Sequence, residues 1–427
     1  MNIVVFLNSL GLGGTEKAAC RWAGGLCERG HQVVVFSLQD GPRRMELERN
    51  NVEVRLVKPE AGEVIAALRE VSPDAVHAHA PGHPHAGDIL GQALAALPRV
   101  PVVQTNIFGQ LLNPQEEAWT DFRLFVSWTS CVQAARRAGR RLDEVFFRRA
   151  SVAVYPVDAE EPCSAAEVAA FRKQIGVRKD EVLFGRLSRP DPNKWTDLAL
   201  EAFQTALRRN RALKLLLREP PPAIAEKLRV SPDADHFLIL PATVDSRELC
   251  LTLSALDVVL HTSSIGESFG YGIAEPMNLG KPVITHSVPW HDQAQIELVR
   301  HGECGFIAST PAAMAQAILR LAGDATARQA MGQAGLKHIR LVADPATSVA
   351  RVEQALRAAV AKQDNPAVLE DLRRASQAAL YLDSHQFGHT LGEQLRLRLG
   401  YALAHFHTLR QRLLRSGEAR TVYSPRR

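Results

Sequence analysis

The stretch ESFGYGIAEPMNLGKPVI, residues 267–284, carries the strongest structural signal in the chain. It follows one short apolar run, Asp257–His261, and its last residues begin a second, Pro282–Thr285; both runs are typical of buried strands. The pattern predicts a strand-end loop at Glu267, followed by a helix that contains Glu275 and ends at a glycine. A strand, a helix and a second strand in this order form a βαβ unit, and such units build parallel sheets.

The same alternation of strands and helical stretches extends in both directions along the chain. Five strands are expected in the first half, at residues 3–7, 33–37, 52–57, 75–79 and 102–105. Three more are expected in the second half, at residues 182–185, 213–217 and 237–240. The sequence therefore predicts an α/β protein with two doubly wound parallel sheets, joined by the Pro- and acid-rich stretch 155–162. Beyond residue 345 the pattern contains helices only, expected at residues 350–362, 366–382 and 391–415.

Composition places the chain among soluble enzymes. Its 427 residues are enough for two domains and an appendage, and 46% hydrophobic with 23% charged residues is the usual globular balance. No apolar stretch is long enough to span a bilayer, and the N-terminus lacks the basic start of a signal peptide. The six cysteines include no C-x-x-C pair, which favours reduced thiols in a cytoplasmic protein over disulfides or a zinc site.

The formal net charge of +5 is concentrated at the end of the chain. From residue 394 to 427, eight arginines face one acid, so the remainder carries −2. A basic end favours an anionic partner, and we expect no nucleic acid. Five apolar residues recur there at helical spacing: Leu391, Leu395, Leu399, Leu403 and Phe406. Either they pack on the body of the protein, or this helix makes peripheral contact with an anionic membrane at its inner face.

A glycine-rich loop follows the first predicted strand. A dinucleotide-binding fingerprint would require a third glycine where Glu16 stands, and an acid at the end of the second strand, where Ser37 stands. A nicotinamide cofactor is therefore excluded. Gly13 and Gly14 still leave backbone amides at a helix N-terminus open to a phosphate or a sugar, although a simple tight turn would use the same residues.

Arg186 and Lys194 follow the first strand of the second half. Ligands of open parallel sheets bind at the carboxyl ends of the strands, where an arginine can grip a diphosphate with two hydrogen bonds and a lysine adds a charge. Glu267 and Glu275 could accept hydrogen bonds from the hydroxyls of a sugar and a ribose. Ser268, Phe269 and Gly270 complete this loop. Gly270 and Gly272 have no side chains, so they leave the backbone N–H groups at the start of the helix accessible to a ligand. Solvated surface charges are the alternative interpretation of both pairs.

Taken together, these segments resemble the retaining glycosyltransferases of family 4, which have the GT-B fold. The resemblance covers residues 1–345, and it also rests on the Arg29–His31 turn and the stretch Asp74–His79. It implies two Rossmann-like domains facing across a cleft. The N-terminal acceptor-side domain would span residues 1–160, the nucleotide-sugar domain 161–345 and a helical extension 346–427.

The resemblance also implies roles for the candidate residues. Gly14 would lie beside the donor phosphates, and Arg186 and Lys194 would bind the diphosphate. Glu275 would hold the ribose hydroxyls, and Glu267 the transferred sugar. No metal or other cofactor is expected, because the two cations stabilise the departing nucleoside diphosphate. The implied donor is a UDP-sugar or GDP-sugar. The implied acceptor is a glycan or lipid-linked glycan in surface polysaccharide or glycoconjugate biosynthesis.

Three positions depart from the family pattern. Six residues separate Leu187 from Lys194, which is longer than usual, so Arg189 competes with Arg186 as the phosphate ligand. Asn106 replaces a histidine near the donor sugar, and an amide can bond a hydroxyl but cannot carry a proton at neutral pH. Pro276 replaces the commoner alanine and removes a helix N–H.

Other motifs suggest competing functions. Four histidines, His77, His79, His83 and His85, invite a metal site, but no acid or cysteine completes a ligand set, and His79 better suits a sugar contact or a structural role. Asp233 and Asp235 mimic a metal-binding D-x-D, but they precede a strand instead of following one. The alternative functions are a sugar-nucleotide 2-epimerase and a non-catalytic nucleotide-sugar-binding scaffold. Donor turnover that requires an acceptor would separate them from a transferase.

Overall fold

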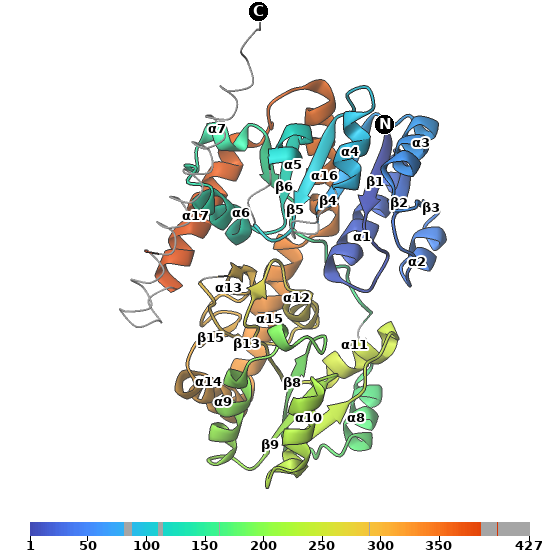
Figure 1. Cartoon of the computed structure of the whole chain (residues 1–427). Coiled ribbons are helices and arrows are strands. Elements are labelled where there is room, and N and C mark those ends of the chain that lie inside the picture. The colour runs from blue at the N-terminus through green and yellow to red at the C-terminus, as the bar shows by residue number, and fades with distance from the viewer. Residues whose placement is uncertain (81–87, 110–113, 162, 290, 386–398, 400–427) are drawn as a thin grey trace, which may run out of the picture. The chain divides into compact units, whose positions relative to one another are not determined.

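The computed structural model describes residues 1–80, 88–109, 114–161, 163–289, 291–385 and 399 (Figure 1). Contacts divide the chain into two compact units. Unit 1 contains Met1–Ala153 and the chain from Arg351 onward, and unit 2 contains Val154–Ala350. Unit 1 is therefore discontinuous. The division falls at 153/154 and 350/351, beside the predicted boundaries at 160/161 and 345/346.

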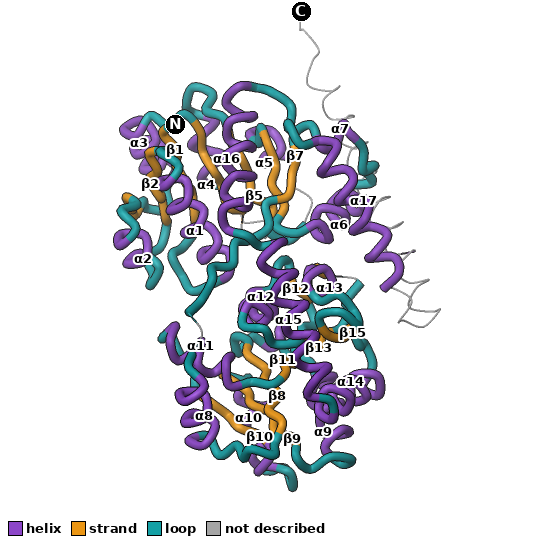
Figure 2. Tube along the Cα trace, turned by 180° about the vertical axis from the view of Figure 1, so that it is seen from behind, coloured by secondary structure: helices purple, strands orange, loops and turns teal. Residues whose placement is uncertain are grey.

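Unit 1 is built on a seven-stranded parallel sheet in the order β3-β2-β1-β4-β5-β6-β7. Its strands are β1 Asn2–Leu7, β2 Gln32–Ser37, β3 Glu53–Leu56, β4 Ala75–Ala80, β5 Val102–Asn106, β6 Phe122–Phe125 and β7 Ala150–Val152. The helices between them are α1 Gly14–Glu28, α2 Arg44–Arg49, α3 Ala61–Val71, α4 Ile89–Ala95, α5 Pro114–Trp119, α6 Trp128–Arg137 and α7 Glu144–Phe147. Helices cover both faces of the sheet (Figure 2), and all strands but the edge strand β3 therefore have buried residues on both faces.

Unit 2 repeats this architecture with six parallel strands in the order β10-β9-β8-β11-β13-β15. These strands are β8 Val182–Leu187, β9 Leu213–Arg218, β10 Phe237–Leu240, β11 Val258–Leu260, β13 Val283–Thr285 and β15 Gly305–Ile307. A separate two-stranded sheet pairs β12 Gly266–Glu267 with β14 Asp292–Gln293. The helices are α8 Ala165–Gln174, α9 Asp197–Leu207, α10 Pro222–Arg229, α11 Ser246–Ala255, α12 Tyr271–Asn278, α13 Ala294–Leu298, α14 Pro311–Gly323 and α15 Ala325–Val342.

The predicted α/β architecture with two parallel sheets is confirmed. All ten predicted strands are present, and they correspond to β1 to β5, β8 to β11 and β13. The sequence did not indicate β6, β7 or β15. These strands have three or four residues each. Their neighbours supply the pairing that such short segments need.

Two further helices, α16 Pro345–Ala361 and α17 Val368–His385, agree with the predicted helices at 350–362 and 366–382. α17 packs on unit 1 through the buried carboxylate of Asp371. It accepts hydrogen bonds from Ser151 Oγ at 2.6 Å, Asn365 Nδ2 at 2.8 Å and Arg351 Nη1 at 3.0 Å. Burial raises the pKa of Asp371, against these bonds. Of the predicted helix 391–415, only Leu399 is described, and the rest lies outside the described residues.

The predicted linker is part of unit 2. The backbone N–H of Val157 donates to Ala343 O at 3.0 Å, and Tyr271 Oη donates to Pro156 O at 3.1 Å. The six cysteines are free thiols. Within the described residues, no helix combines the length and apolar character needed to span a membrane.

Candidate functional site

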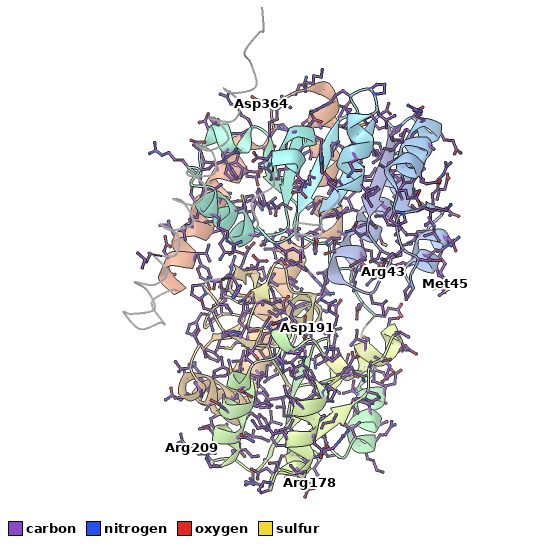
Figure 3. The ribbon with its side chains drawn as sticks, in the orientation of Figure 1. Arg43, Met45, Arg178, Asp191, Arg209 and Asp364 are labelled. Carbon is purple, nitrogen blue, oxygen red and sulfur yellow. The ribbon has the colours of Figure 1, made fainter. Side chains whose placement is uncertain are left out.

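The candidate site of unit 2 lies at the carboxyl edge of its sheet. β8, β11 and β13 are parallel neighbours, so the residues that follow them meet at one edge. Figure 3 shows Asp191, which follows β8, at the opposite end of the unit from Arg178, which precedes it. Arg186, His261 and His286 all occupy this edge and are buried. The pattern-based placement of Arg186 at a strand end is confirmed.

Arg186 is almost completely buried, with 1% of its surface exposed. Its Nη2 donates to the carbonyl of Lys194, and its guanidinium carbon lies 4.3 Å from the centroid of the Trp195 ring. Nε and Nη1 have no partner among the described residues. Burial lowers the pKa of Arg186 to about 9, so the group remains a cation at neutral pH. A buried cation with unused donors is a strong site for an anion.

The glycine before this arginine has a packing role. A Cβ on Gly185 would lie 2.3 Å from the Leu256 side chain, so a larger residue there would force Leu256 to move. The competing cation, Arg189, is exposed, and its carbonyl accepts a hydrogen bond from Trp195 Nε1 at 2.7 Å. Trp195 therefore links the backbone of the inserted loop to the guanidinium of Arg186, which favours Arg186 as the buried ligand.

Lys194 and Glu267 form the central ion pair of the site. Lys194 Nζ lies 2.8 Å from Glu267 Oε2 and also donates to Gly266 O at 3.2 Å. Burial alone would raise the pKa of Glu267, but Lys194 and a hydrogen bond from His261 hold it at about 2. Glu267 is therefore a carboxylate at neutral pH, able to accept hydrogen bonds.

Two further residues contact Glu267, and the sequence pattern did not indicate either of them. His261 Nε2 lies 3.2 Å from Glu267 Oε1, and Gln295 Oε1 accepts from the Glu267 backbone N–H at 3.0 Å. The position of His261 immediately after β11 was the available signal, because it shares its edge with Arg186. Gln295 lies 28 residues away in α13, and no local pattern connects it to Glu267.

The loop around Glu267 is held by its glycines. Glu267, expected in a loop, is the second residue of β12. Gly266 has φ +64°, and a Cβ there would lie 1.7 Å from Asp292 O, so only glycine permits the pairing with β14. Gly270 caps α12 with φ +103°, and a Cβ there would lie 3.3 Å from Glu267 Cβ. Both positions require the left-handed region that glycine alone enters readily.

The remaining candidates of this segment differ in exposure. The Phe269 ring is buried, 5.6 Å from Tyr155 and 5.0 Å from Tyr271, and therefore packs the loop on the former linker. Ser268 is half-buried beside it, and Glu275 is half-buried in α12. Pro276 lies inside α12, which ends at Asn278 shortly before Gly280. The prediction that Glu275 lies on a helix after the loop is confirmed.

Unit 1 carries the other candidates at the carboxyl edge of its own sheet. Gly13 caps α1, and Gly14 is its first residue. A Cβ on Gly13 would lie 2.2 Å from Glu16 Oε2, and Ser9 Oγ donates to Glu16 Oε1 at 3.0 Å. The Glu16 carboxylate thus folds back over the glycine loop. A carboxylate there repels phosphate and can accept a hydrogen bond from a hydroxyl.

His79 and Asn106 lie at the ends of the neighbouring strands β4 and β5, and both are buried. The His79 ring nitrogens have no partner among the described residues, and its ring lies 4.4 Å from that of His77. His77 Nε2 lies 2.8 Å from Thr105 Oγ1. Burial lowers the pKa of His77 to about 3 and that of His79 well below its ordinary value, so both rings are neutral.

No cluster of three or more metal-ligating side chains occurs within the part of the chain that the structure describes. His83 and His85 lie outside that part. Asp233 is bound by Arg211 Nη1 at 2.6 Å, and Asp235 lies in a short 3-10 helix before β10. The D-x-D motif therefore precedes its strand, as the sequence indicated.

Two family models match the chain. The one described as glycosyl transferase 4-like domain matches residues 13–184, and the one described as glycosyl transferases group 1 matches residues 178–324. The two matches overlap at residues 178–184, and together they cover most of both sheets. Among curated protein sequences, none matches this chain.

Solved structures of similar fold are numerous. HepE of Anabaena in complex with UDP aligns with a TM-score of 0.69 at 19% identity, over 84% of this chain and 100% of HepE. A glycosyltransferase from Rickettsia africae ESF-5 aligns with a TM-score of 0.70 at 14% identity, over 85% and 100% of the two chains. Sucrose-phosphate synthase from Thermosynechococcus elongatus gives 0.67 at 16% identity, over 85% and 100%. At these identities the similarity shows the fold.

Proposed function

We propose that the chain, a family 4-type glycosyltransferase by its two family matches and its GT-B fold, transfers a sugar from a nucleotide sugar with retention of configuration and without a metal ion. The acceptor we propose is a glycan or lipid-linked glycan of surface polysaccharide or glycoconjugate biosynthesis. The observation that carries the proposal is the cluster of the buried Arg186 with the partly buried Lys194 and Glu267 at one sheet edge.

The charge balance of this cluster suits a nucleoside diphosphate sugar. Arg186 and Lys194 supply two cations, and Glu267 supplies one carboxylate held at the same place. The unused guanidinium donors of Arg186 would bind the diphosphate, with Lys194 adding its ammonium charge. As the bond to the sugar breaks, negative charge builds on the departing phosphate, and preorganised cations stabilise it. These cations, which the protein itself supplies, support the proposal of metal-independent transfer.

Glu267 suits the binding of sugar hydroxyls better than covalent catalysis. Both its oxygens already accept hydrogen bonds, and its pKa of about 2 makes it a weak nucleophile. On unit 1, Asn106 cannot act as a base, and burial lowers the pKa of His79, which makes its neutral ring a weak base. We infer that retention arises without a covalent enzyme intermediate, with the acceptor entering on the face that the diphosphate leaves.

The other candidates complete the proposed donor site. Glu275 of α12 would bind the ribose hydroxyls, and the glycine loop at Gly13 and Gly14 would approach the donor. Because Glu16 covers this loop, we favour a sugar hydroxyl over a phosphate there. Ser268, Phe269 and Gly270 would shape the loop that carries Glu267.

The neighbours suggest which compounds to test first. HepE is solved with UDP, with UDP and glucose, and with UDP-glucose, and WaaG is a glycosyltransferase involved in lipopolysaccharide biosynthesis. We therefore propose a UDP-sugar before a GDP-sugar as the donor. We further propose a cytoplasmic enzyme with peripheral contact at the inner face of the membrane through its basic end, residues 394–427, which lie outside the described part except for Leu399.

A donor screen followed by product analysis tests this proposal. Thermal shift with UDP, GDP and their glucose and mannose conjugates identifies the donor. A ligand at 100 times its Kd adds about 2.7 kcal/mol of stability. Proton NMR of the transferred sugar then reports its anomeric configuration, and EDTA tests metal dependence. An inverted product, or activity abolished by EDTA and restored by one metal, would contradict the mechanism. Turnover without any acceptor, yielding an epimerised donor, would contradict the transferase.

A further inference from the structure

His261 contacts Glu267 of the candidate site but has no role in the proposed transfer reaction. We propose that His261 is a positioning residue, which fixes the Glu267 carboxylate in the orientation that receives the transferred sugar. It does so by donating a hydrogen bond from Nε2 to Glu267 Oε1, 3.2 Å away. This inference rests on the proposed function, in which Glu267 contacts the donor sugar.

The direction of this hydrogen bond follows from its two partners. An ionised carboxylate only accepts, so the proton lies on Nε2 of the His261 ring. The other nitrogen, Nδ1, is buried and has no partner among the described residues. Burial lowers the pKa of His261, so at neutral pH the ring is the neutral Nε2–H tautomer. A neutral donor orients the carboxylate without adding a third positive charge beside Arg186 and Lys194.

The two partners differ in how firmly the backbone holds them. His261 is 5% exposed, and its backbone N–H donates to Ile284 O at 2.8 Å, within the ladder of the main sheet. Glu267 belongs to the two-residue strand β12, which pairs only with β14 among the described strands. A site residue on a short segment needs support from a rigid element. The hydrogen bond from His261 links Glu267 to the central strands of unit 2.

Lys194 cannot provide this support alone. Its ammonium has three protons, of which Glu267 Oε2 and Gly266 O take two. In the proposed function it also serves the diphosphate, which draws the ammonium away from the carboxylate. The His261 donor has Glu267 as its partner and no competing acceptor in the described part of the chain. His261 therefore keeps Glu267 in place when the donor binds.

Two variants of His261 and a control separate positioning from packing. In His261→Gln, the amide Nε2 can replace the lost donor, and in His261→Leu a side chain of similar size has no donor. The control is His236→Gln, a partly exposed histidine at the amino end of β10, whose Nδ1 bonds Leu213 O at 2.8 Å. Calorimetry measures the Kd of UDP and of UDP-glucose, and then of GDP and GDP-mannose. Within each pair, the ratio of the two Kd values gives the contribution of the sugar to binding.

We expect His261→Leu to weaken sugar-nucleotide binding about tenfold or more, the usual effect of losing a hydrogen bond to a charged group. Binding of the plain nucleotide should change less than twofold, which also shows that the variant is folded. His261→Gln should recover most of the loss, and His236→Gln should match the wild type. If His261→Leu keeps the wild-type ratio between the Kd values of the sugar nucleotide and the plain nucleotide, the positioning role is wrong while the proposed function stands. If the wild type binds neither sugar nucleotide, the proposed function fails first.

Discussion

Arg186 combines a cationic side chain with an almost dry environment. Its guanidinium stacks on Trp195 and keeps two nitrogens without partners in the described residues. Such an arrangement costs stability unless an anion completes it. Arg189, three residues further on, is exposed to water, so its charge does not destabilise the free protein and an anion would stabilise it little. The choice that the sequence left open between these two arginines can therefore be tested by substitution.

We expect Arg186→Ala to weaken nucleotide-sugar binding by about 1.5–3 kcal/mol, hence roughly tenfold or more, because it removes charged hydrogen bonds to phosphate. Lys194→Ala should act in the same direction. Arg189→Ala is the matched control and should bind as the wild type does. Calorimetry with the donor found in the screen measures all three. Loss of binding in Arg189→Ala, with Arg186→Ala unaffected, would reverse the assignment.

At the scale of elements, the loop from β11 to α12 shows how far local patterns predict a site. Glycine spacing and the two glutamates indicated a loop followed by a helix, and that helix is α12. The pairing of β12 with β14 was not predictable, because it depends on contacts between segments 26 residues apart. The same holds for Gln295. Local signals identify which residues cluster at a strand end, whereas the partners that orient them come from tertiary packing.

The substitution Gly270→Ala tests the role of this loop. It forces an alanine into φ +103° and places its Cβ 3.3 Å from Glu267 Cβ, so both the backbone and the carboxylate must move. Gly302 has φ +80° but nothing within 4 Å of an added Cβ, which makes Gly302→Ala the control. Both variants should lose about 1–2 kcal/mol of stability through backbone strain.

Only Gly270→Ala should also lose sugar-nucleotide affinity, by roughly tenfold. Thermal melting and calorimetry measure the two effects separately. Equal affinity in both variants would show that Glu267 tolerates a displaced loop.

The paired histidines of β4 should make unit 1 sensitive to acid. In the folded chain the pKa of His77 is about 3, whereas an unfolded histidine titrates near 6.5. Above pH 6.5 neither state is protonated. As the pH falls from 6.5 towards 3, the unfolded state binds a proton that the folded state refuses. Stability should therefore fall by up to about 1.4 kcal/mol per pH unit for this residue.

Thermal melts of the wild type and of His77→Asn at pH 7 and pH 5 measure this effect. The variant should lose less stability between the two pH values, by about 2 kcal/mol. His236→Asn is the control, because this histidine is partly exposed. If His77→Asn has the same pH dependence as the wild type, the His77 ring must bind a proton as readily in the folded chain as in the unfolded chain.

At the scale of the whole molecule, the chain from residue 351 to residue 385 contacts three arginines of the N-terminal part of unit 1, Arg136, Arg148 and Arg149. Arg136 Nη2 lies 3.0 Å from both carboxylate oxygens of Asp383, and Arg149 donates to the carbonyls of Lys362 and Gln363. Asp364 lies within 4 Å of Arg148 and Arg149. Charge counting along the sequence could not reveal these pairs, because they join segments more than 200 residues apart. The charges of Arg136, Arg148 and Arg149 are therefore already partly compensated.

This compensation decides where the tail should be cut in a membrane-binding test. A chain ending after Lys362 loses α17 with the buried Leu382 and Asp371, and it exposes the arginines that α17 covers. We expect this chain to lose about 3 kcal/mol or more of its free energy of unfolding. It would also bind anionic vesicles through the newly exposed arginines, whether or not the basic end binds membranes. A chain ending after His385 keeps the whole of α17, with the bonds of Asp371 and Asp383 to unit 1.

Flotation with phosphatidylserine vesicles at low and high salt compares these chains with the full-length protein. If the basic end binds the membrane, the full chain floats, salt weakens it and the cut after His385 abolishes flotation. A full-length chain that stays unbound at low salt would show that the tail has another role.

The discontinuity of unit 1 has a consequence for synthesis on the ribosome. Ser151 of the edge strand β7 bonds Asp371, which is translated 220 residues later. At about 5–20 residues per second this interval lasts roughly 10–40 s. During that time unit 2 is synthesised in full, while β7 waits without the helix that later covers it. The domain begun first is thus the last to be completed, and the nascent chain presents an open sheet edge that chaperones can recognise.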